Sequence, residues 1–289
     1  MKIAISGSTG FLGKGLALAL TENAHQVLHI TRDPDKSRMV FGQEVACLDL
    51  NQDDEALLAE TQSFGVEVFI HTATHFSRSR NISDLQDIIT GAMTNSVRIY
   101  ELSRHVGASF LNFNSMWQLS QDGNLAGTPY AAAKDAFRTY LRQSNVGASQ
   151  IIRDVFIPET FGPGDTRRKI VQILLESKKS GVFPEIQNPD ALIDLLYSPS
   201  LTAFVLAKLG SLNDLPGEFA VINYPRIKIK DLRDFITSED FENEVTAFDS
   251  LYPKLDSLGF TSSAPLKSSI EVLVPPSPEL GLALRKCTF

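Results

Sequence analysis

The chain has 289 residues, 43% of them hydrophobic and 21% charged, as in an ordinary globular protein that buries a substantial core. Its formal net charge is −7 with no long basic run, which argues against a nucleic-acid partner or an anionic membrane surface. The chain opens directly on a strand, has two cysteines and lacks an apolar stretch of roughly 18 residues, so we expect a cytoplasmic protein with no membrane segment.

Short β-rich runs alternate with helical patterns through the first half of the chain. We expect strands at residues 2–6, 26–31, 44–50, 66–73, 109–115 and 149–155. Helices are expected between them at residues 11–23, 53–62, 84–107 and 129–146. Strands joined by helices of this length predict an α/β fold, with a Rossmann-type doubly wound parallel sheet covered by helices on both faces.

The pattern changes after residue 161. The turn-rich segment FGPGDTRR is followed by a helical pattern at about 167–180 and then by shorter, proline-rich elements. We therefore expect a Rossmann domain over 1–160, to which segments around 190–222 return, and a smaller C-terminal substrate-binding lobe over most of 161–289. The final stretch, VPPSPELGLALRKCTF, has little helical signal, and we expect it to be poorly ordered.

A glycine-rich segment, GSTGFLG, follows the first predicted strand and opens the first predicted helix. Its glycines are Gly7, Gly10 and Gly13. A dinucleotide site needs a tight turn there, close approach of the backbone to a pyrophosphate, and a helix N-terminus facing the anion. The alternative is a plain strand-to-helix turn. The position directly after a buried strand favours dinucleotide binding.

The end of the second predicted strand decides which dinucleotide is favoured. An acidic residue there bonds the ribose 2′-hydroxyl of NAD, whereas an arginine accommodates the 2′-phosphate of NADP. The sequence reads HITRDPDKSR, with Arg32 at or just beyond the strand end. Asp33 would allow NAD if the strand ended one residue later, and Lys36 and Arg38 are as well explained as solvated charges. The pattern favours NADPH, with NAD less favoured.

A tyrosine precedes a lysine by four residues at two places in the chain. In TPYAAAK, Thr128 and Pro129 are suited to starting a helix, which would place Tyr130 and Lys134 on one face. In YPRIK, a proline follows Tyr224 and biases it away from helical geometry, so we interpret that copy as coincidental.

The first pair has the chemistry of a proton donor. A free tyrosine titrates near pH ~10, and a neighbouring ammonium group favours its phenolate. A nicotinamide exchanges a hydride only while another group manages the proton on the reacting oxygen. Ser115, which ends the strand SFLNFNS, is the candidate for bonding that oxygen. The predicted catalytic residues are therefore Ser115, Tyr130 and Lys134.

Together these motifs resemble the extended short-chain dehydrogenases/reductases that act on nucleotide sugars. The resemblance rests on GSTGFLG, HTAT, Ser115, YAAAK and FGPGD, which span much of the chain. The segments FNSMWQ, YAAAKDAF, TFGPGDTRRK and IDLLY are similar to the CDP-abequose and CDP-paratose synthase group, whose members reduce a nucleotide-linked 6-deoxy-4-ketohexose with NADPH. The cofactor-binding residues expected on the motifs and the resemblance are Gly7, Thr9, Gly10, Phe11, Leu12, Gly13, Arg32, Asp49, Leu50, Thr72, Ala73, Thr74, Tyr130 and Lys134.

Within this family the resemblance favours a 4-ketoreductase. Dehydratases of the family carry an Asp-Glu pair after the catalytic Ser or Thr, whereas this chain has Met116 and Trp117, which cannot act as acid and base. A 4-epimerase with a retained NAD(P) is the alternative. A non-enzymatic dinucleotide-sensing protein on the same fold would be favoured by loss of the catalytic residues, all of which are present.

The substrate side departs from the family pattern. The arginine that grips the substrate pyrophosphate in many members is replaced by Ile193, so Arg167 and Arg168 are candidates for holding it, with solvated charges in the first turn of a helix as the equal alternative. Trp117 could stack on a sugar or base or belong to the core, and we expect it in the pocket. The spacing of His, Cys and carboxylates indicates no metal site. Helices 84–107 and 129–146 resemble the family's dimer-forming pair, so we expect a homodimer.

Overall fold

The computed structural model of the protein describes residues 1–77, 81–119, 128–147, 149–242 and 270–287. The chain divides into two compact units. The first, unit 1, comprises Met1–Phe156 and Lys208–Phe219, and the second, unit 2, comprises Ile157–Ala207 and Ala220–Phe289. Among the described residues, no helix is long and apolar enough to cross a membrane.

The elements of the first 157 residues alternate as the sequence predicts. They are β1 (Lys2–Ser6), α1 (Phe11–Glu22), β2 (Gln26–Thr31), α2 (Pro34–Phe41), β3 (Ala46–Asp49), α3 (Asp54–Phe64), β4 (Val68–His71), α4 (Ile82–Ile89), η1 (Thr90–Thr94), α5 (Asn95–His105), β5 (Ser109–Ser115), η2 (Met116–Gln118), α6 (Pro129–Ser144) and β6 (Ile152–Ile157). Helix α2 is an addition to the prediction, capped at its start by the Asp33 carboxylate. The segment expected as one helix over 84–107 is helical throughout, but η1 is a π-helical turn within it.

The later elements are shorter. They are β7 (Glu159–Phe161), α7 (Ile170–Ser180), β8 (Leu192–Ile193), β9 (Leu195–Tyr197), α8 (Ser198–Lys208), η3 (Leu209–Asp214), β10 (Glu218–Val221), β11 (Ile227–Lys228), α9 (Ile229–Thr237), η4 (Glu239–Glu242), β12 (Glu271–Leu273) and α11 (Leu280–Arg285).

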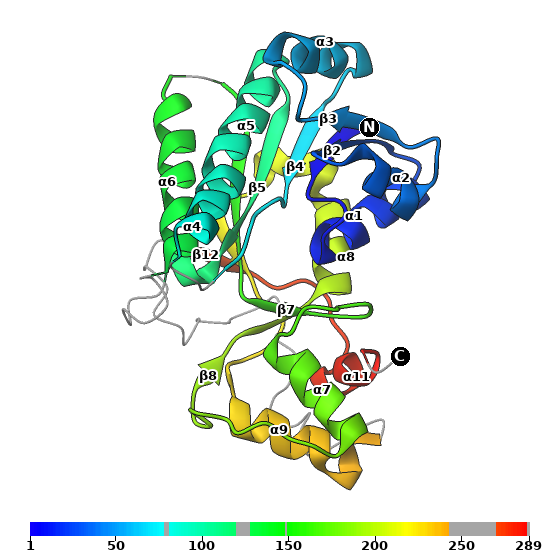
Figure 1. Ribbon diagram of the computed structural model, residues 1–289, viewed down its shortest axis with the longest axis vertical. Helices are drawn as coiled ribbons and strands as arrows, with labels where there is room; N and C mark the ends of the chain where they lie inside the picture. Colours follow the sequence, from blue (N-terminus) through cyan, green and yellow to red (C-terminus); the bar gives the residue numbers. More distant parts are fainter. Residues whose placement is uncertain (78–80, 120–127, 148, 243–269, 288–289) are drawn as a thin grey trace. The chain divides into compact units, whose positions relative to one another are not determined.

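The central sheet has eight strands in the order β12-β10-β6-β5-β4-β1-β2-β3 (Figure 1). Strand β1 pairs in parallel with β2 on one side and β4 on the other, and the pairs β2–β3 and β4–β5 are also parallel. The direction of strand order therefore reverses at β1, between β2 and β4, which is the switch point at which doubly wound sheets bind ligands. The architecture confirms the predicted Rossmann-type fold.

The core of unit 1 lies between the sheet and a layer of helices. Residues from β1, β2, β4 and β5 pack there against α3, α5 and α6, and the largest fully buried side chains include Phe69, Tyr100, Phe110 and Phe137. Helices α5 and α6 lie side by side in Figure 1. Because side chains alternate along a strand, Ala4 faces this core while its neighbours on β1 face the opposite side. The sheet is thus apolar on both faces, as expected for buried parallel strands.

Unit 2 has a core of its own, and that core corrects one expectation about the tail. Residues 280–285, expected to be poorly ordered, form α11. Leu280, Ala283 and Leu284 are fully buried there, at positions i, i+3 and i+4 of the helix. A helix this short has little stability in isolation, so burial of its apolar face supplies what local propensity does not.

The two cysteines, Cys47 and Cys287, are free thiols.

Candidate active site

The glycine turn after β1 is closed so tightly that Gly7 and Gly13 leave no space for a side chain. Gly7 has a φ of +75°, and a Cβ there would lie 2.7 Å from the backbone nitrogen of Ala73. A Cβ on Gly13 would lie 2.1 Å from the carbonyl oxygen of Gly7. The hydroxyl of Thr72 donates to the Ser6 carbonyl at 2.8 Å and fixes the segment after β4 beside this turn. The two segments predicted to bind the cofactor, after β1 and after β4, therefore lie in contact.

Helix α1 begins at this turn without a side-chain cap. Gly10 is its N-cap residue and supplies no side-chain capping hydrogen bond. Such an N-terminus carries partial positive charge and suits a phosphate group. The absence of a Cβ on Gly7, Gly10 and Gly13 keeps the turn compact, so the geometry fits the pyrophosphate of a dinucleotide. Thr9 lies on this turn, and Phe11 and Leu12 are the first two residues of α1.

The ends of β2 and β3 are joined by Asn51, which sequence reasoning did not single out. Its side-chain amide donates to the Arg32 carbonyl at 2.8 Å and to the Asp49 carboxylate at 2.8 Å. The Leu50 amide donates to the Thr31 carbonyl at 2.8 Å. Arg32, Asp49 and Leu50 are therefore neighbours, as a site for the adenosine half of a cofactor requires.

Arg32 and Asp33 have different roles at this edge. Strand β2 ends at Thr31, so Arg32 is the first residue beyond it, and its side chain is exposed. The Asp33 carboxylate accepts a hydrogen bond from the Lys36 amide at 3.0 Å as the N-cap of α2. Asp33 thus caps a helix, whereas the Arg32 side chain is exposed just beyond the end of β2. Arg38 pairs instead with Asp35 at 3.0 Å.

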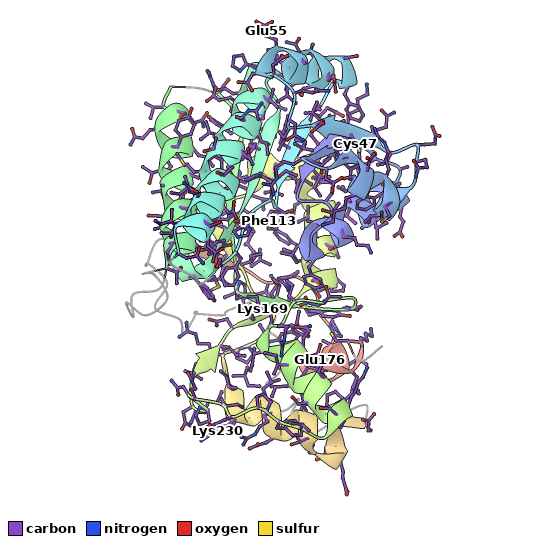
Figure 2. The ribbon with its side chains drawn as sticks, viewed as in Figure 1. Cys47, Glu55, Phe113, Lys169, Glu176 and Lys230 are labelled. Atoms are coloured by element: carbon purple, nitrogen blue, oxygen red, sulfur yellow. The ribbon has the colours of Figure 1, made fainter. Side chains whose placement is uncertain are left out.

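Helix α6 carries both members of the tyrosine–lysine pair. Pro129 occupies its first turn, and the Thr128 hydroxyl accepts from the Ala131 amide at 3.1 Å, which confirms the predicted helix start. The Lys134 ammonium is only 3% exposed and donates to the Phe113 carbonyl on β5 at 2.5 Å. Figure 2 labels Phe113 within the sheet. Lys134 is therefore held against the backbone two residues before Ser115.

Ser115 ends β5 and is fixed by a short capping arrangement. Its hydroxyl oxygen accepts from the Trp117 amide at 3.3 Å, and its own amide donates to the Gln118 side chain at 2.9 Å. Because the oxygen acts as an acceptor in this cap, the hydroxyl hydrogen can be donated to a substrate oxygen. The geometry suits the role predicted for Ser115 in the reaction.

Two aromatic rings lie against the tyrosine. The rings of Phe76 and Trp117 lie 5.1 Å and 6.4 Å from that of Tyr130, both edge to face. Phe76 and Trp117 are 5.5 Å apart and also meet edge to face. Phe76, which follows the HTAT segment, escaped sequence reasoning, because a single exposed phenylalanine in a loop gives no periodic signal. The rings give the surroundings of Tyr130 an apolar wall.

Buried charges lie next to Lys134. Burial lowers the pKa of Lys134 to about 8, against the opposing effect of the Asp154 carboxylate. Burial also raises the pKa of Asp154 to about 6, although hydrogen bonds from Asn112 and Asn114 favour its charged form. The His71 ring hydrogen-bonds Ser6 and Ser96, and burial with the nearby Lys134 charge holds the pKa of His71 well below its usual range. His71 is therefore neutral at neutral pH.

The residues of the second tyrosine–lysine copy make structural contacts in unit 2. Tyr224 is fully buried, and its hydroxyl donates to the Pro278 carbonyl at 2.9 Å. Lys228 lies 3.5 Å from Asp190 in an exposed ion pair. The two residues serve different contacts, in keeping with the interpretation that their spacing is coincidental.

The candidate substrate arginines also belong to unit 2. Arg167 forms an ion pair with Asp165 at 2.7 Å and donates to the Thr160 carbonyl at 2.8 Å, so its guanidinium braces the turn that follows β7. Arg168 is exposed. Ile193, which stands where many relatives have arginine, pairs with Ile227 of β11. The adjacent Arg226, bound to Asp194 at 3.0 Å, is a cation that the sequence did not flag.

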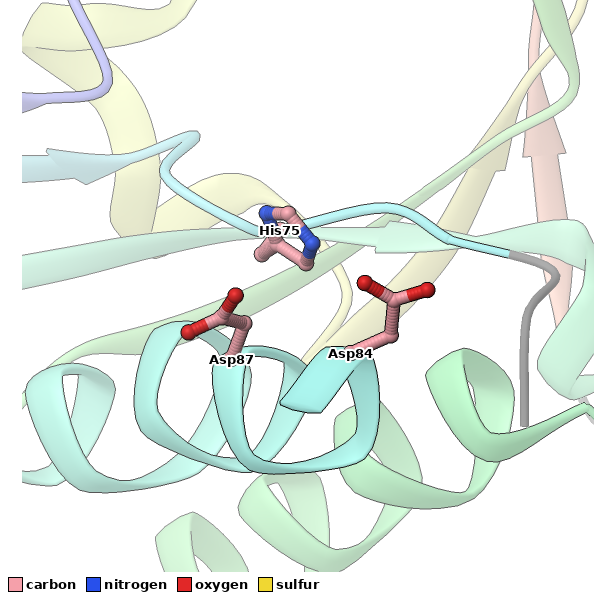
Figure 3. Close-up of side chains that lie close together, drawn as sticks. All are labelled: His75, Asp84 and Asp87. Carbon is pink, nitrogen blue, oxygen red and sulfur yellow. The ribbon is translucent and has the colours of Figure 1, made fainter. Parts of the chain in front are cut away.

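One group of side chains in unit 1 could hold a metal ion. Ligand atoms of His75, Asp84 and Asp87 lie within 4.8 Å of one another, with the histidine in the loop after β4 and both carboxylates on α4 (Figure 3). Imidazole and carboxylate donors together suit Zn²⁺ or Mn²⁺. Sequence spacing gave no hint of this group because the loop and the helix meet only in the fold. The expectation that the protein uses no metal stays a prediction.

The chain matches a known protein family and is similar to a known protein. Residues 3–218 match the model of a family described as the NAD dependent epimerase/dehydratase family. The chain is similar to the CDP-abequose synthase of Yersinia pseudotuberculosis, with 22% identity over 219 residues, or 74% of this chain and 75% of the relative.

Two solved structures show the same fold. The UDP-glucose 4-epimerase of Thermotoga maritima, solved with UDP-glucose, gives a TM-score of 0.73 at 15% identity, covering 99% of this chain and 98% of the other. The UDP-glucose 4-epimerase of Thermus thermophilus, solved with NAD, gives 0.67 at 16% identity, covering 98% and 92%.

Proposed function

We propose that this chain, which belongs to the NAD-dependent epimerase/dehydratase family, reduces the 4-keto group of a nucleotide-linked 6-deoxy-4-ketohexose with NADPH. The observation that carries the proposal is the position of Lys134. Its ammonium bonds the Phe113 carbonyl, two residues before Ser115, on the helix that presents Tyr130. A proton donor, its electrostatic partner and a hydroxyl for the substrate oxygen thus come from adjoining parts of unit 1.

Each residue of this arrangement has a distinct role in the proposed reaction. NADPH, when bound, supplies the hydride that reaches the C4 carbon of the sugar. Tyr130 donates its phenolic proton to the C4 oxygen. Lys134 stabilises the resulting phenolate through its positive charge. Ser115 donates a hydrogen bond to the same oxygen as negative charge develops on it.

NADPH is proposed rather than NADH because of the residue after β2. Arg32 can meet a 2′-phosphate, while Asp33, the residue that would bond a 2′-hydroxyl, caps α2. The pyrophosphate would be held at the turn of Gly7, Gly10 and Gly13, with Thr72, Ala73 and Thr74 beside it.

Reduction is favoured over dehydration by the residues after Ser115. Met116 is buried, and the Trp117 ring contacts Tyr130, so neither position supplies an acid or a base. We also propose that unit 2 provides substrate contacts, with Arg168 and Arg226 as cations for the diphosphate and Arg167 bracing the turn that carries Arg168. Helices α5 and α6 are proposed to form the interface of a homodimer.

A 4-epimerase is the second candidate. It is favoured by the solved structures, since both relatives described above are 4-epimerases and one was solved with NAD. An epimerase must keep its cofactor between two hydride transfers, whereas a reductase releases NADP⁺ after one. Cofactor retained through purification would favour the epimerase, and consumption of added NADPH would favour the reductase.

The proposed function is tested by NADPH oxidation with CDP- and dTDP-4-keto-6-deoxyglucose supplied in parallel. We expect substrate-dependent loss of NADPH absorbance, and a fall of about 100-fold or more in the Tyr130→Phe variant, because the proton donor is removed. The matched control is Tyr224→Phe, which makes the same change in the second tyrosine–lysine copy and should retain activity. Absence of NADPH consumption with both substrates would contradict the proposal for this class of sugar.

A further inference from the structure

A buried carboxylate lies on β6, the strand next to β5, and the Phe113 carbonyl of β5 binds the proposed catalytic lysine. Asp154 of β6 is 3% exposed, and one of its oxygens accepts hydrogen bonds from the side-chain amides of Asn112 at 2.7 Å and Asn114 at 2.5 Å. These asparagines flank Phe113, whose carbonyl accepts the Lys134 ammonium. The same three residues of β5 therefore hold both the anion and the cation.

The other charges nearby are already paired with one another. Arg138 of α6 makes two hydrogen bonds to Glu218 on β10, at 2.7 Å and 2.8 Å, and a third to Asp135 at 3.1 Å. Glu218 is also paired with Arg142. The Asp154 carboxylate is the charge that acts on Lys134, and it also feels the charges of Arg138 and Glu218, which are hydrogen-bonded to each other.

A buried ammonium needs such a partner. Removal from water favours the neutral amine, and a nearby carboxylate favours the charged form. These two opposing effects are the ones that set the titration of Lys134. His71 on β4 faces the same ammonium and contributes no charge at neutral pH. Without Asp154, burial would act on Lys134 unopposed.

We propose that Asp154 is a positioning residue whose buried carboxylate keeps Lys134 protonated beside Tyr130. This role rests on the proposed function for its effect on catalysis, whereas the charge pair itself is a property of the folded chain. Asn112 and Asn114 belong to the same arrangement because they hold the carboxylate without neutralising it. No oxidant or further reactant is involved, since Asp154 acts through its charge alone.

The catalytic consequence is tested with Asp154→Asn, which keeps the size of the side chain and an acceptor for the two asparagines. We expect the alkaline loss of reductase activity to move to lower pH by about one unit or more, because Lys134 then gives up its proton sooner. The variant and the wild type should converge below pH about 6, where Asp154 itself becomes protonated. An unmoved alkaline limb would overturn the catalytic role.

The matched control is Asp135→Asn. It removes one negative charge from the residue next to Lys134 on α6, but its side chain is 53% exposed and pairs with Arg138. The alkaline limb should stay in place in this variant. An equal shift in both variants would mean that general charge, rather than Asp154, sets the titration.

The charge pair can also be tested without substrate. Urea unfolding gives the change in the free energy of unfolding for Asp154→Asn, for Lys134→Met and for the double variant. The two single changes should not add up to the change in the double variant at about pH 7, and should add up at about pH 5, where Asp154 is neutral. Additivity at both values would overturn the pairing, whatever the reductase assay gives. Non-additivity together with a wild type that never consumes NADPH would leave the pair standing and reject the proposed function.

If Asp154→Asn does not fold, the pair can be tested from the other side, by titrating Asp154 in a variant of Lys134. The carboxyl carbon of Asp154, followed by NMR, should titrate at higher pH in Lys134→Met than in the wild type, because the neighbouring positive charge is gone. An unchanged titration would argue against the pair.

Discussion

Arg32 is the residue on which the proposed cofactor preference depends. It follows β2 directly, its backbone carbonyl is held by Asn51, and its side chain is exposed. A hydrogen-bonded contact between a guanidinium group and a phosphate contributes about 1.5–3 kcal/mol, or roughly 10-fold to 100-fold in affinity. One side chain is therefore sufficient to discriminate between two cofactors that differ by a single phosphate.

Replacing this side chain should remove the preference selectively. In Arg32→Ala we expect the KM for NADPH to rise about tenfold or more while the KM for NADH changes little, because only NADPH carries the 2′-phosphate. Steady-state kinetics with both cofactors checks this. Arg38→Ala is the control, since Arg38 is paired with Asp35 on α2. An equal rise for both cofactors would indicate a structural effect instead.

At the scale of elements, the β1–α1 turn has no space for added side chains at its glycines Gly7 and Gly13. The atoms of Gly7 and Thr72 occupy the space that a side chain on Gly13 would need. Overpacking of this kind typically costs about 1–3 kcal/mol, and here it would also displace the start of α1.

Gly13→Ala should therefore weaken cofactor binding as well as stability. We expect a lower urea midpoint and at least a tenfold loss of NADPH affinity, because the anion site at the helix N-terminus is displaced. Cofactor titration and urea unfolding measure the two effects. Gly210→Ala serves as the control, because a Cβ there meets nothing within 4 Å. Unchanged NADPH affinity in Gly13→Ala would show that this turn does not hold the cofactor.

Elements with strong local signals could be predicted from the sequence. The doubly wound sheet follows from alternating strand and helix patterns, and the start of α6 follows from Thr128 and Pro129. The family resemblance, carried by short motifs, is confirmed by the match over residues 3–218. Helix α2 had a usable signal in its Asp-Pro start but is only eight residues long. Helix α11 had little local signal. It forms because its apolar face is buried in the core of unit 2, which a local pattern does not show.

The surroundings of the candidate site were less predictable. Asp154 is separated from Asn112 and Asn114 by about forty positions, and an aspartate inside a strand pattern gives no sign of its partners. The same limit applies to Phe76, whose ring reaches Tyr130 from a loop. Local patterns gave the catalytic candidates themselves, while the charges and rings around them depend on how strands and loops meet.

At the scale of the whole molecule, the chain passes from unit 1 into unit 2, back again, and out once more. Residues 208–219 return to unit 1, where the Asp154 amide donates to the Gly217 carbonyl at 2.9 Å and Glu218 binds Arg138. Strand β10 lies beside β6 in the sheet. The first 157 residues therefore lack strand β10 of the sheet and Glu218, the half-buried counter-charge of the buried Arg138.

A fragment of residues 1–157 should consequently fail to fold cooperatively. It would leave Arg138 with only the exposed Asp135 as a partner and the edge of β6 unpaired, and removing one partner of a buried ion pair typically costs about 3–5 kcal/mol. Urea unfolding followed by circular dichroism checks this, with a fragment of residues 1–221, which restores β10, as the comparison. A sharp unfolding transition in the shorter fragment would contradict the expectation.

The single tryptophan of the chain gives the protein an optical property of its own. Trp117 is two residues past Ser115, with its ring 6.4 Å from that of Tyr130. Nearly all intrinsic fluorescence of the molecule therefore originates at one known place. Indole emission overlaps the absorption band of reduced nicotinamide, so energy transfer from Trp117 would dim the protein when such a ring arrives nearby. Occupancy of the site can thus be observed by light alone, in an unlabelled and unmodified chain.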